Sequence, residues 1–187
     1  MKITELPLKG AYTIDLEIQE DNRGFFARYF CKKEFEKYGL STHWLQMNTS
    51  LSQKKGTFRG LHYQKEPKAQ AKLVSATVGK IFDVAVDMRR NSPTYGDWVA
   101  AELSEENRHM MFIPSGCAHG FCVLSDNAEV SYKASDEYSP SHEAGVIWND
   151  PDLNVQWPVG APVLSDKDVE LPSFRDTDNN FTHGDKS

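Results

Sequence analysis

The sequence of 187 residues lacks any long apolar run and has few cysteines. No stretch approaches the roughly 20 apolar residues that cross a bilayer, and the first residues contain no apolar segment typical of a secretory signal. The three cysteines are Cys31, Cys117 and Cys122, an odd number without the spacing of a metal site. We therefore expect free thiols and a cytoplasmic location.

An excess of positive charge is also missing. Asp and Glu number 27 against 21 Lys and Arg, so the net charge is −6. Because nucleic acids and anionic membranes are bound by basic surfaces, we expect neither as a partner. A small anionic ligand can still bind in a local basic cleft.

Helical patterns are scarce, and short β-forming runs fill most of the chain. Residues 72–89 form two apolar runs around Gly79, and residues 110–124 read as a strand, a Pro-Ser-Gly turn and a second strand. Residues 32–40 are the one convincing short helix, with Gly39 as its C-terminal cap. The pattern predicts an all-β sandwich or barrel with a few short helices.

The length fits a single domain with a sizeable core. We expect this domain to cover residues 1–171. Residues 172–187 are polar and charge-rich, a composition that buries little apolar surface. They are therefore expected to be a flexible C-terminal tail.

Cations are concentrated in residues 58–74, FRGLHYQKEPKAQAKLV. Long cations such as Arg59 and Lys72 are seldom placed in a barrel interior without an anion or carboxylate to meet. His62, taken alone, would be an ordinary hydrogen-bonded histidine at the edge of the core. With these neighbours it indicates a site for an anionic ligand. A carboxylate from residues 164–168, LSDKD, could orient it as in a general-base dyad, a contact that sequence leaves open.

Residues 114–121, PSGCAHGF, resemble the second motif of cupins, which are small β-barrels. In metal-binding cupins the histidine at the position of His119 is a ligand. The first cupin motif would need two histidines spaced H-x-H, but here it reads His62-Tyr63-Gln64. With too few ligands we expect no metal, and expect His119 to donate to an anionic or other polar group.

Together, the motifs resemble those of the dTDP-4-dehydrorhamnose 3,5-epimerase family. The matching segments, in chain order, are DNRGFF, SQKKGTFRGLHYQ, QAKLV, GKIFDVAVDMRRNSPTYGDW, IPSGCAHGF, YKASDEYSP, GVIWNDPDLNVQWP and LSDKD. They run from about Arg23 to Asp168. The resemblance implies a cupin-like jelly roll, a homodimer with strands exchanged between subunits, and no metal or organic cofactor.

The resemblance also implies epimerisation of a nucleotide-linked 4-keto-6-deoxyhexose at C5, C3 or both, in deoxysugar biosynthesis. The C4 ketone acidifies the hydrogens on C3 and C5, so a base can remove one to give an enolate. An acid then returns a proton to the opposite face. The family match makes His62 the base and Asp168 its dyad partner. Lys72 would stabilise the enolate oxygen, and Tyr132 would be the acid.

Ten further residues match positions that line the substrate site of the family. Arg23, Arg59 and His119 match those that bind the diphosphate and sugar, for which an arginine fork is well suited. The other substrate-binding residues are Phe26, Arg28, Gln46, Asn48, Tyr138, Glu143 and Lys167.

Two departures from the family pattern bear on the carrier nucleotide. Arg28 stands where the family usually has a glutamate near the nucleobase, and Met47 replaces an aspartate. A carboxylate accepts a hydrogen bond from N3 of thymine, whereas arginine only donates and N3 of cytosine accepts. The change is compatible with a 5-epimerase of a CDP-4-keto-3,6-dideoxyhexose. A contact of Arg28 with phosphate or solvent is an equally weighted alternative.

Three other functions stay open at this point. A sugar 3,4-ketoisomerase on a similar barrel is the nearest, although the catalytic set favours epimerisation. A metal-dependent cupin oxygenase predicts a stoichiometric bound metal and conflicts with the missing H-x-H pair. A non-catalytic sugar-binding barrel predicts no exchange of substrate hydrogens with solvent, and it would leave the presence of both His62 and Tyr132 unexplained.

Overall fold

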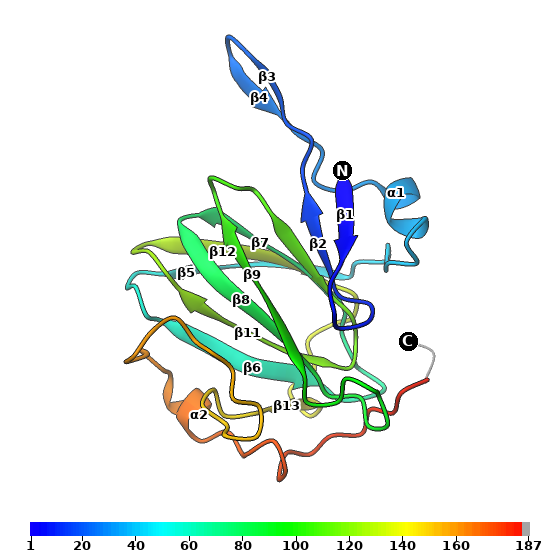
Figure 1. The fold of residues 1–187 in the computed structure, drawn as a ribbon, viewed down its shortest axis with the longest axis vertical. Coiled ribbons are helices and arrows are strands. Elements are labelled where there is room, and N and C mark those ends of the chain that lie inside the picture. The colour runs from blue at the N-terminus through cyan, green and yellow to red at the C-terminus, as the bar shows by residue number, and fades with distance from the viewer. Residues whose placement is uncertain (185–187) are drawn as a thin grey trace.

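Two antiparallel β-sheets form the body of the protein in the computed structural model, which describes residues 1–184 (Figure 1). The larger sheet has the order β1 (Lys2–Glu5), β2 (Tyr12–Asp15), β10 (Met110–Ile113), β7 (Lys72–Val78), β12 (Ala128–Ala134) and β5 (Gln46–Ser52). The smaller sheet has the order β13 (Glu143–Gly145), β6 (Phe58–Gln64), β11 (Cys117–Val123), β8 (Lys80–Asp87) and β9 (Trp98–Ser104). The predicted all-β fold of the jelly-roll type is confirmed.

Tight turns carry the chain from one sheet to the other. β7 in the larger sheet is separated from β8 in the smaller sheet by Gly79 alone, whose φ is +69°. A Cβ at this position would clash with Ser125, so only glycine fits the turn. The Pro-Ser-Gly turn moves the chain in the same way from β10 to β11. Both strand breaks that the sequence predicts are therefore also the points where the two sheets are joined.

Alternation along the strands divides the apolar residues between three clusters. The first lies between the sheets and includes Val74, Met111, Phe121 and Val130. The second lies on the outer face of the smaller sheet and includes Leu61 and Tyr63. The third lies on the outer face of the larger sheet and includes Phe35 and Leu40. Since Leu61 and Tyr63 face outward on β6, His62 between them faces the interior between the sheets.

The C-terminal segment differs from the flexible tail predicted for residues 172–187. Its described part, residues 172–184, packs on the outer face of the smaller sheet. The buried ring of Phe181 lies 5.5 Å from that of Tyr63, and the Tyr63 hydroxyl is 2.8 Å from the Thr177 hydroxyl. The polar composition of the segment did not indicate this packing. One aromatic ring and a few hydrogen bonds are enough to hold the segment on the sheet. Residues 185–187 of the predicted tail lie outside the described residues.

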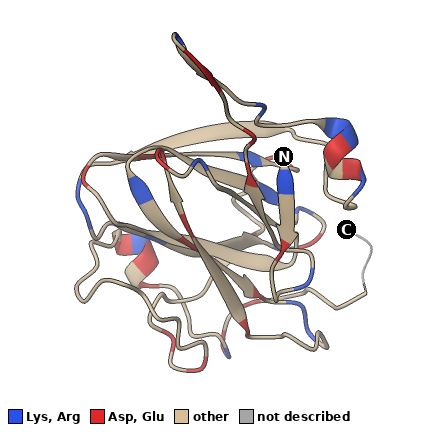
Figure 2. Cartoon of the chain, turned by 45° about the horizontal axis from the view of Figure 1, so that its top comes forward, with Lys and Arg blue, Asp and Glu red and all other residues tan. Residues whose placement is uncertain are grey.

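The two helices in the described part of the chain are short, and residues of both charges are distributed over it. The helix α1 spans Lys32–Glu36 and ends before Gly39, whose φ of +68° fits the predicted cap, while α2 spans Asp166–Val169. Lys, Arg, Asp and Glu are spread over both helices and many loops (Figure 2). None of the helices within residues 1–184 has the length and apolarity needed to cross a bilayer. The three cysteines are free thiols, as expected.

A separate hairpin projects from the body, formed by β3 (Gln19–Asp21) and β4 (Gly24–Phe26) (Figure 1). We call residues 19–26 the arm. Its two strands pair with each other, and all their residues are exposed. At its tip Arg23 donates hydrogen bonds to both carboxylate oxygens of Asp21. The arm therefore has its own internal order while standing apart from the two sheets.

Candidate active site

His62 on β6 and Asp168 on α2 meet, although they are far apart in sequence. His62 Nε2 lies 2.6 Å from Asp168 Oδ1, and the hydroxyl of Ser165 donates to Asp168 Oδ2 at 2.9 Å. Burial alone would raise the pKa of Asp168, but the hydrogen bonds from His62 and Ser165 lower it below its usual value. The ionised carboxylate thus holds the imidazole in place, and His62 Nδ1 has no hydrogen-bond partner within residues 1–184. This is the geometry of a general-base dyad.

A second histidine–carboxylate pair lies beside the first. His119 on β11 is the direct cross-strand partner of His62, and its Nε2 lies 2.7 Å from Oδ1 of the fully buried Asp83 on β8. Burial lowers the pKa of His119; the charges of Lys72 and His62 lower it further, against the opposing effect of Asp83. A neutral His119 donates Nε2–H to the carboxylate, which leaves Nδ1 as an acceptor. This geometry suits a sugar hydroxyl, which is the polar alternative to the anionic group among the two partners that the sequence suggested for His119.

Lys72 is the cation of the interior. It shares its strand face with Val74 and Ala76, which belong to the cluster between the sheets, so it points inward as well. Loss of hydration lowers the pKa of Lys72 to about 8, while Asp83 and Glu143 oppose this effect. An ammonium group with few water molecules around it stabilises a nearby developing oxyanion strongly.

Tyr132 faces the same interior from the larger sheet. It lies on β12 directly across from Asn48 on β5, and it packs against the cluster between the sheets. Burial raises the pKa of Tyr132, whereas a hydrogen bond with Asn48 and the charge of Arg59 lower it in part. Its hydroxyl is therefore protonated at neutral pH and can donate. Because His62 belongs to the smaller sheet, His62 and Tyr132 stand on opposite walls.

Two of the polar residues near these groups, Tyr138 and Lys167, are held by a common carboxylate, that of Glu143. Its Oε2 accepts from the Tyr138 hydroxyl at 2.7 Å and lies 2.7 Å from Lys167 Nζ. The backbone N–H of Tyr138 donates to Gln46 Oε1 at 2.9 Å. Burial acts to raise the pKa of Glu143, but these two partners lower it overall. Arg59 adds a guanidinium that donates through Nε to Ser52 at 3.3 Å.

Three predicted site residues lie elsewhere in the single chain. Arg23 and Phe26 belong to the arm, and Arg28 follows it with Nη1 3.7 Å from Glu34 on α1. No hydrogen bond or ion pair within residues 1–184 joins these three residues to the rest of the predicted site. The remaining predicted residues converge on the space between the sheets or its rim.

Sequence reasoning missed Asp83 and Ser165. The signal for Asp83 was a carboxylate inside the apolar run of residues 81–86, where an unpaired charge is costly. The signal for Ser165 was its position three residues before Asp168, which is the spacing of an N-cap. Among residues 1–184, no group of three or more His, Cys, Asp or Glu side chains converges as a metal site would require.

Comparisons with known proteins agree over nearly the whole chain. The family model described as dTDP-4-dehydrorhamnose 3,5-epimerase matches residues 5–176. The chain is 47% identical to the dTDP-4-dehydrorhamnose 3,5-epimerase of Shigella flexneri over 179 residues, covering 95% of this chain and 98% of that one. It is 46% identical to the enzyme of the same name from Methanothermobacter thermautotrophicus over 172 residues, covering 90% and 92%.

Solved structures give the same result. The crystal structure of dTDP-4-dehydrorhamnose 3,5-epimerase from Elizabethkingia anophelis superimposes with a TM-score of 0.91 at 45% identity, covering 94% of this chain and 97% of that one. A 3,5-epimerase from Legionella pneumophila, solved in complex with dTDP-4-keto-L-rhamnose, superimposes with a TM-score of 0.88 at 43% identity and covers 93% of both chains.

Proposed function

The chain belongs to the dTDP-4-dehydrorhamnose 3,5-epimerase family, and on that premise we propose how its residues carry out the reaction. The family predicted from the motifs is confirmed, and the protein is an isomerase of deoxysugar biosynthesis. Its substrate is a nucleotide-linked 4-keto-6-deoxyhexose. The observation that carries the proposed mechanism is the placement of His62 and Tyr132 on facing sheets with Lys72 in the same interior.

The proposed cycle begins with proton abstraction. His62 accepts the proton from C3 or C5 through Nδ1, and the ionised Asp168 stabilises the resulting imidazolium. The electron pair moves to the C4 oxygen, and the ammonium of Lys72 stabilises this enolate. Tyr132 then donates its hydroxyl proton to the other face of the same carbon, which inverts it. Solvent removes the proton from His62 and restores that of Tyr132 before the second carbon reacts.

Activity should fall as the pH rises through about 8. The pKa of Lys72 is lowered to about 8, so its ammonium form dominates below that pH and is lost above it. Since only the ammonium stabilises the enolate, kcat/KM should decline by about tenfold per pH unit on the alkaline side. A profile between about pH 6 and about pH 10 measures this. Lys72→Arg should lower the rate but move the decline of kcat/KM to higher pH, because arginine keeps its charge. If the decline stayed at the same pH, the titration of another group would cause it.

The diphosphate is proposed to bind at Arg59 together with Arg23 from the arm of a second copy. Two features of the single chain support a homodimer with exchanged arms. The arm exposes Phe26, and the free-edge strand β5 exposes Met47 and Leu51 on the larger sheet. A second copy would cover these apolar side chains and bring Arg23 to a site that its own arm does not contact. Free cysteines support a reducing, cytoplasmic location, which we also propose.

The carrier is proposed to be dTDP, the carrier in the names of the relatives. Arg28 favours a second candidate, a 5-epimerase of a CDP-4-keto-3,6-dideoxyhexose, because arginine is a donor and cytosine N3 an acceptor. Against this, the Arg28 guanidinium already has the carboxylate of Glu34 nearby in its own chain. An arginine that pairs with Glu34 does not need a nucleobase partner.

Incubation with dTDP- or CDP-4-keto-6-deoxyglucose in deuterated water tests both substrate and stereochemistry. We expect NMR to show deuterium at C3 and C5 of the dTDP-sugar, with both centres inverted. Label at C5 alone would reduce the reaction to a 5-epimerisation. Faster reaction of the CDP-sugar, lost in Arg28→Glu, would support the second candidate. Without label from either substrate, the proposed epimerase reaction is wrong.

A further inference from the structure

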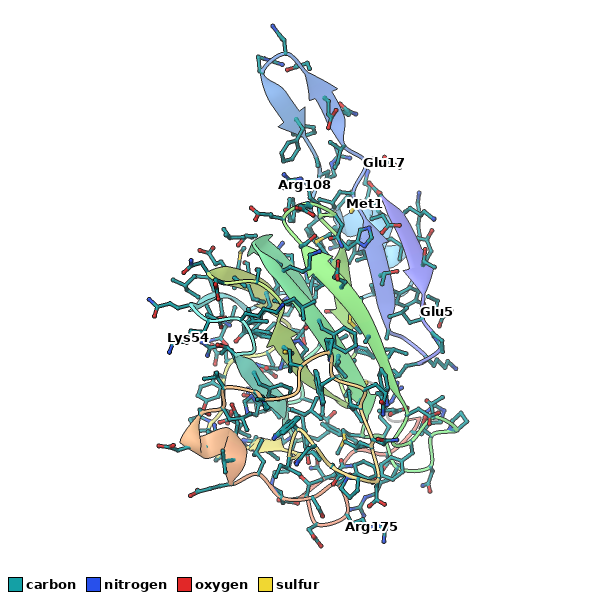
Figure 3. The ribbon with its side chains drawn as sticks, turned by 60° about the vertical axis from the view of Figure 1, so that its left-hand side comes forward. Met1, Glu5, Glu17, Lys54, Arg108 and Arg175 are labelled. Carbon is teal, nitrogen blue, oxygen red and sulfur yellow. The ribbon has the colours of Figure 1, made fainter. Side chains whose placement is uncertain are left out.

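Apart from its chain connections, the arm has one described side-chain contact with its own body within residues 1–184, a cation–π contact. The hydrogen bonds and ion pairs of residues 19–26 lie within the arm, as far as the described part of the chain extends. The cation–π contact joins the arm to the body: the Arg108 guanidinium lies over the ring of Phe25, 4.0 Å from the ring centroid. Figure 3 shows Arg108 at the foot of the arm, on the side of the body from which the arm projects.

The turn that carries Arg108 is well fixed. Arg108 has a φ of +54° and lies between β9 and β10, and its backbone N–H donates to Ser104 O at 2.9 Å. Asn107 Oδ1 accepts from the backbone N–H groups of Ser104 and His109, both at 3.0 Å. His109 Nε2 lies 3.2 Å from Asp15, the last residue of β2 before the chain leaves for the arm. The turn thus holds both the root of the arm and the ring of Phe25.

We propose that Arg108 is a positioning residue for substrate binding, which sets the direction of the arm through its contact with Phe25. The inference rests on the proposed function, in which the arm delivers Arg23 and Phe26 to the site of a second copy. In the free chain, a two-stranded hairpin without other attachments samples many directions, and ordering it against the second copy and the substrate lowers affinity. The cation–π contact restricts those directions before the substrate arrives. Phe25 is exposed and Arg108 half-buried, and a partly exposed contact of this kind changes the population by about two- to fivefold.

Arg108→Ala tests the proposal, with Arg175→Ala as the matched control. Within residues 1–184, Arg175 is likewise an arginine with one partner, Asp152; it is exposed whereas Arg108 is half-buried, and Figure 3 places it at the opposite end of the molecule. For Arg108→Ala we expect KM for the nucleotide sugar to rise by about two- to fivefold, with kcat and the melting temperature unchanged. Trypsin cleavage after Arg23 should become faster by a similar factor, because the arm samples more directions. Arg175→Ala should change none of these quantities.

Phe25→Leu tests whether the effect comes from the cation–π contact itself or only from the charge of Arg108. It removes the ring but keeps an apolar side chain, so its KM should match that of Arg108→Ala. The double variant should be no worse than either single one, because both changes remove the same contact. Arg108→Lys, which keeps a cation, should recover part of the loss. Additive effects of the two changes on KM in the double variant would overturn the proposal. A fall in kcat by the same factor as the rise in KM, together with a lower melting temperature, would also overturn it.

Arg23→Ala distinguishes the two ways in which the inference can fail. If Arg23→Ala raises KM and Arg108→Ala does not, the arm contributes to substrate binding but Arg108 does not position it. If Arg23→Ala leaves KM unchanged, the proposed role of the arm is wrong, and the inference about Arg108 is wrong with it. The epimerase reaction itself is measured separately, by solvent exchange at C3 and C5 in the same variants.

Discussion

His62→Ala is expected to lower both epimerisation and solvent exchange by about 100- to 10,000-fold, the range that a general base contributes. The variant removes the ring nitrogen that accepts the substrate proton, so no enolate forms and both measurements fall together. Deuterium incorporation into the nucleotide sugar, followed by NMR over time, measures exchange, and the configuration of the product measures inversion. Binding should change little, because the diphosphate is held by the arginines.

Two further variants are needed to interpret this result: one tests the dyad partner, and the other is a control. Asp168→Asn keeps the shape of the side chain but removes the charge that stabilises the imidazolium, so we expect a large loss with nearly unchanged KM. His43→Ala changes an exposed histidine in the loop before β5 and should behave as wild type. If His62→Ala retained exchange within about tenfold of wild type, another base would have to exist and the dyad would be structural.

Part of this site could be read from the sequence because strands alternate. Lys72 opens an apolar strand, and His62 lies between two residues that reappear in the outer cluster, so their inward direction follows from the period of a strand. Which of these groups meet is a matter of register between distant strands. The cross-strand pairing of His119 with His62 and the contact of Asp168 with His62 depend on the whole fold. The strand pattern therefore predicted the components, the family resemblance predicted the contact of His62 with Asp168, and the structure supplied the pairing of His119 with Asp83.

The differences have physical reasons of the same kind. Residues 172–184 read as a flexible tail because composition averages over a segment, whereas a single buried ring such as Phe181 decides whether it packs. Asp83 was overlooked because a carboxylate in an apolar run indicates that a partner exists but does not identify it, and the partner His119 lies on another strand. The arm is the opposite case. Arg23 and Phe26 were predicted from family motifs to line the site, yet the single chain holds them apart from it, and we propose that they reach the site of a second copy.

Tyr132→Phe should allow the substrate hydrogens to exchange with solvent while it prevents inversion of the sugar carbon. The variant keeps the ring that packs against the cluster between the sheets and removes only the hydroxyl that donates the proton. His62 still forms the enolate, and in deuterated water it returns a deuteron to the face from which it took the proton. We expect label in the substrate with retained configuration, while inversion falls by about 100- to 10,000-fold. NMR distinguishes the labelled substrate from the epimer.

A matched control for Tyr132→Phe is Tyr95→Phe, which removes a hydroxyl from a tyrosine that packs on Phe174, outside the site. It should exchange and invert at the wild-type rate. Two results would contradict the role of Tyr132. Equal loss of exchange and inversion would mean that its hydroxyl acts during enolate formation. Normal inversion would mean that a different group, or water, supplies the proton. Because burial raises the pKa of Tyr132, a protonated phenol is present throughout the neutral range. The loss of inversion should therefore be independent of pH between about 6 and about 8, which separates a missing donor from a shifted titration.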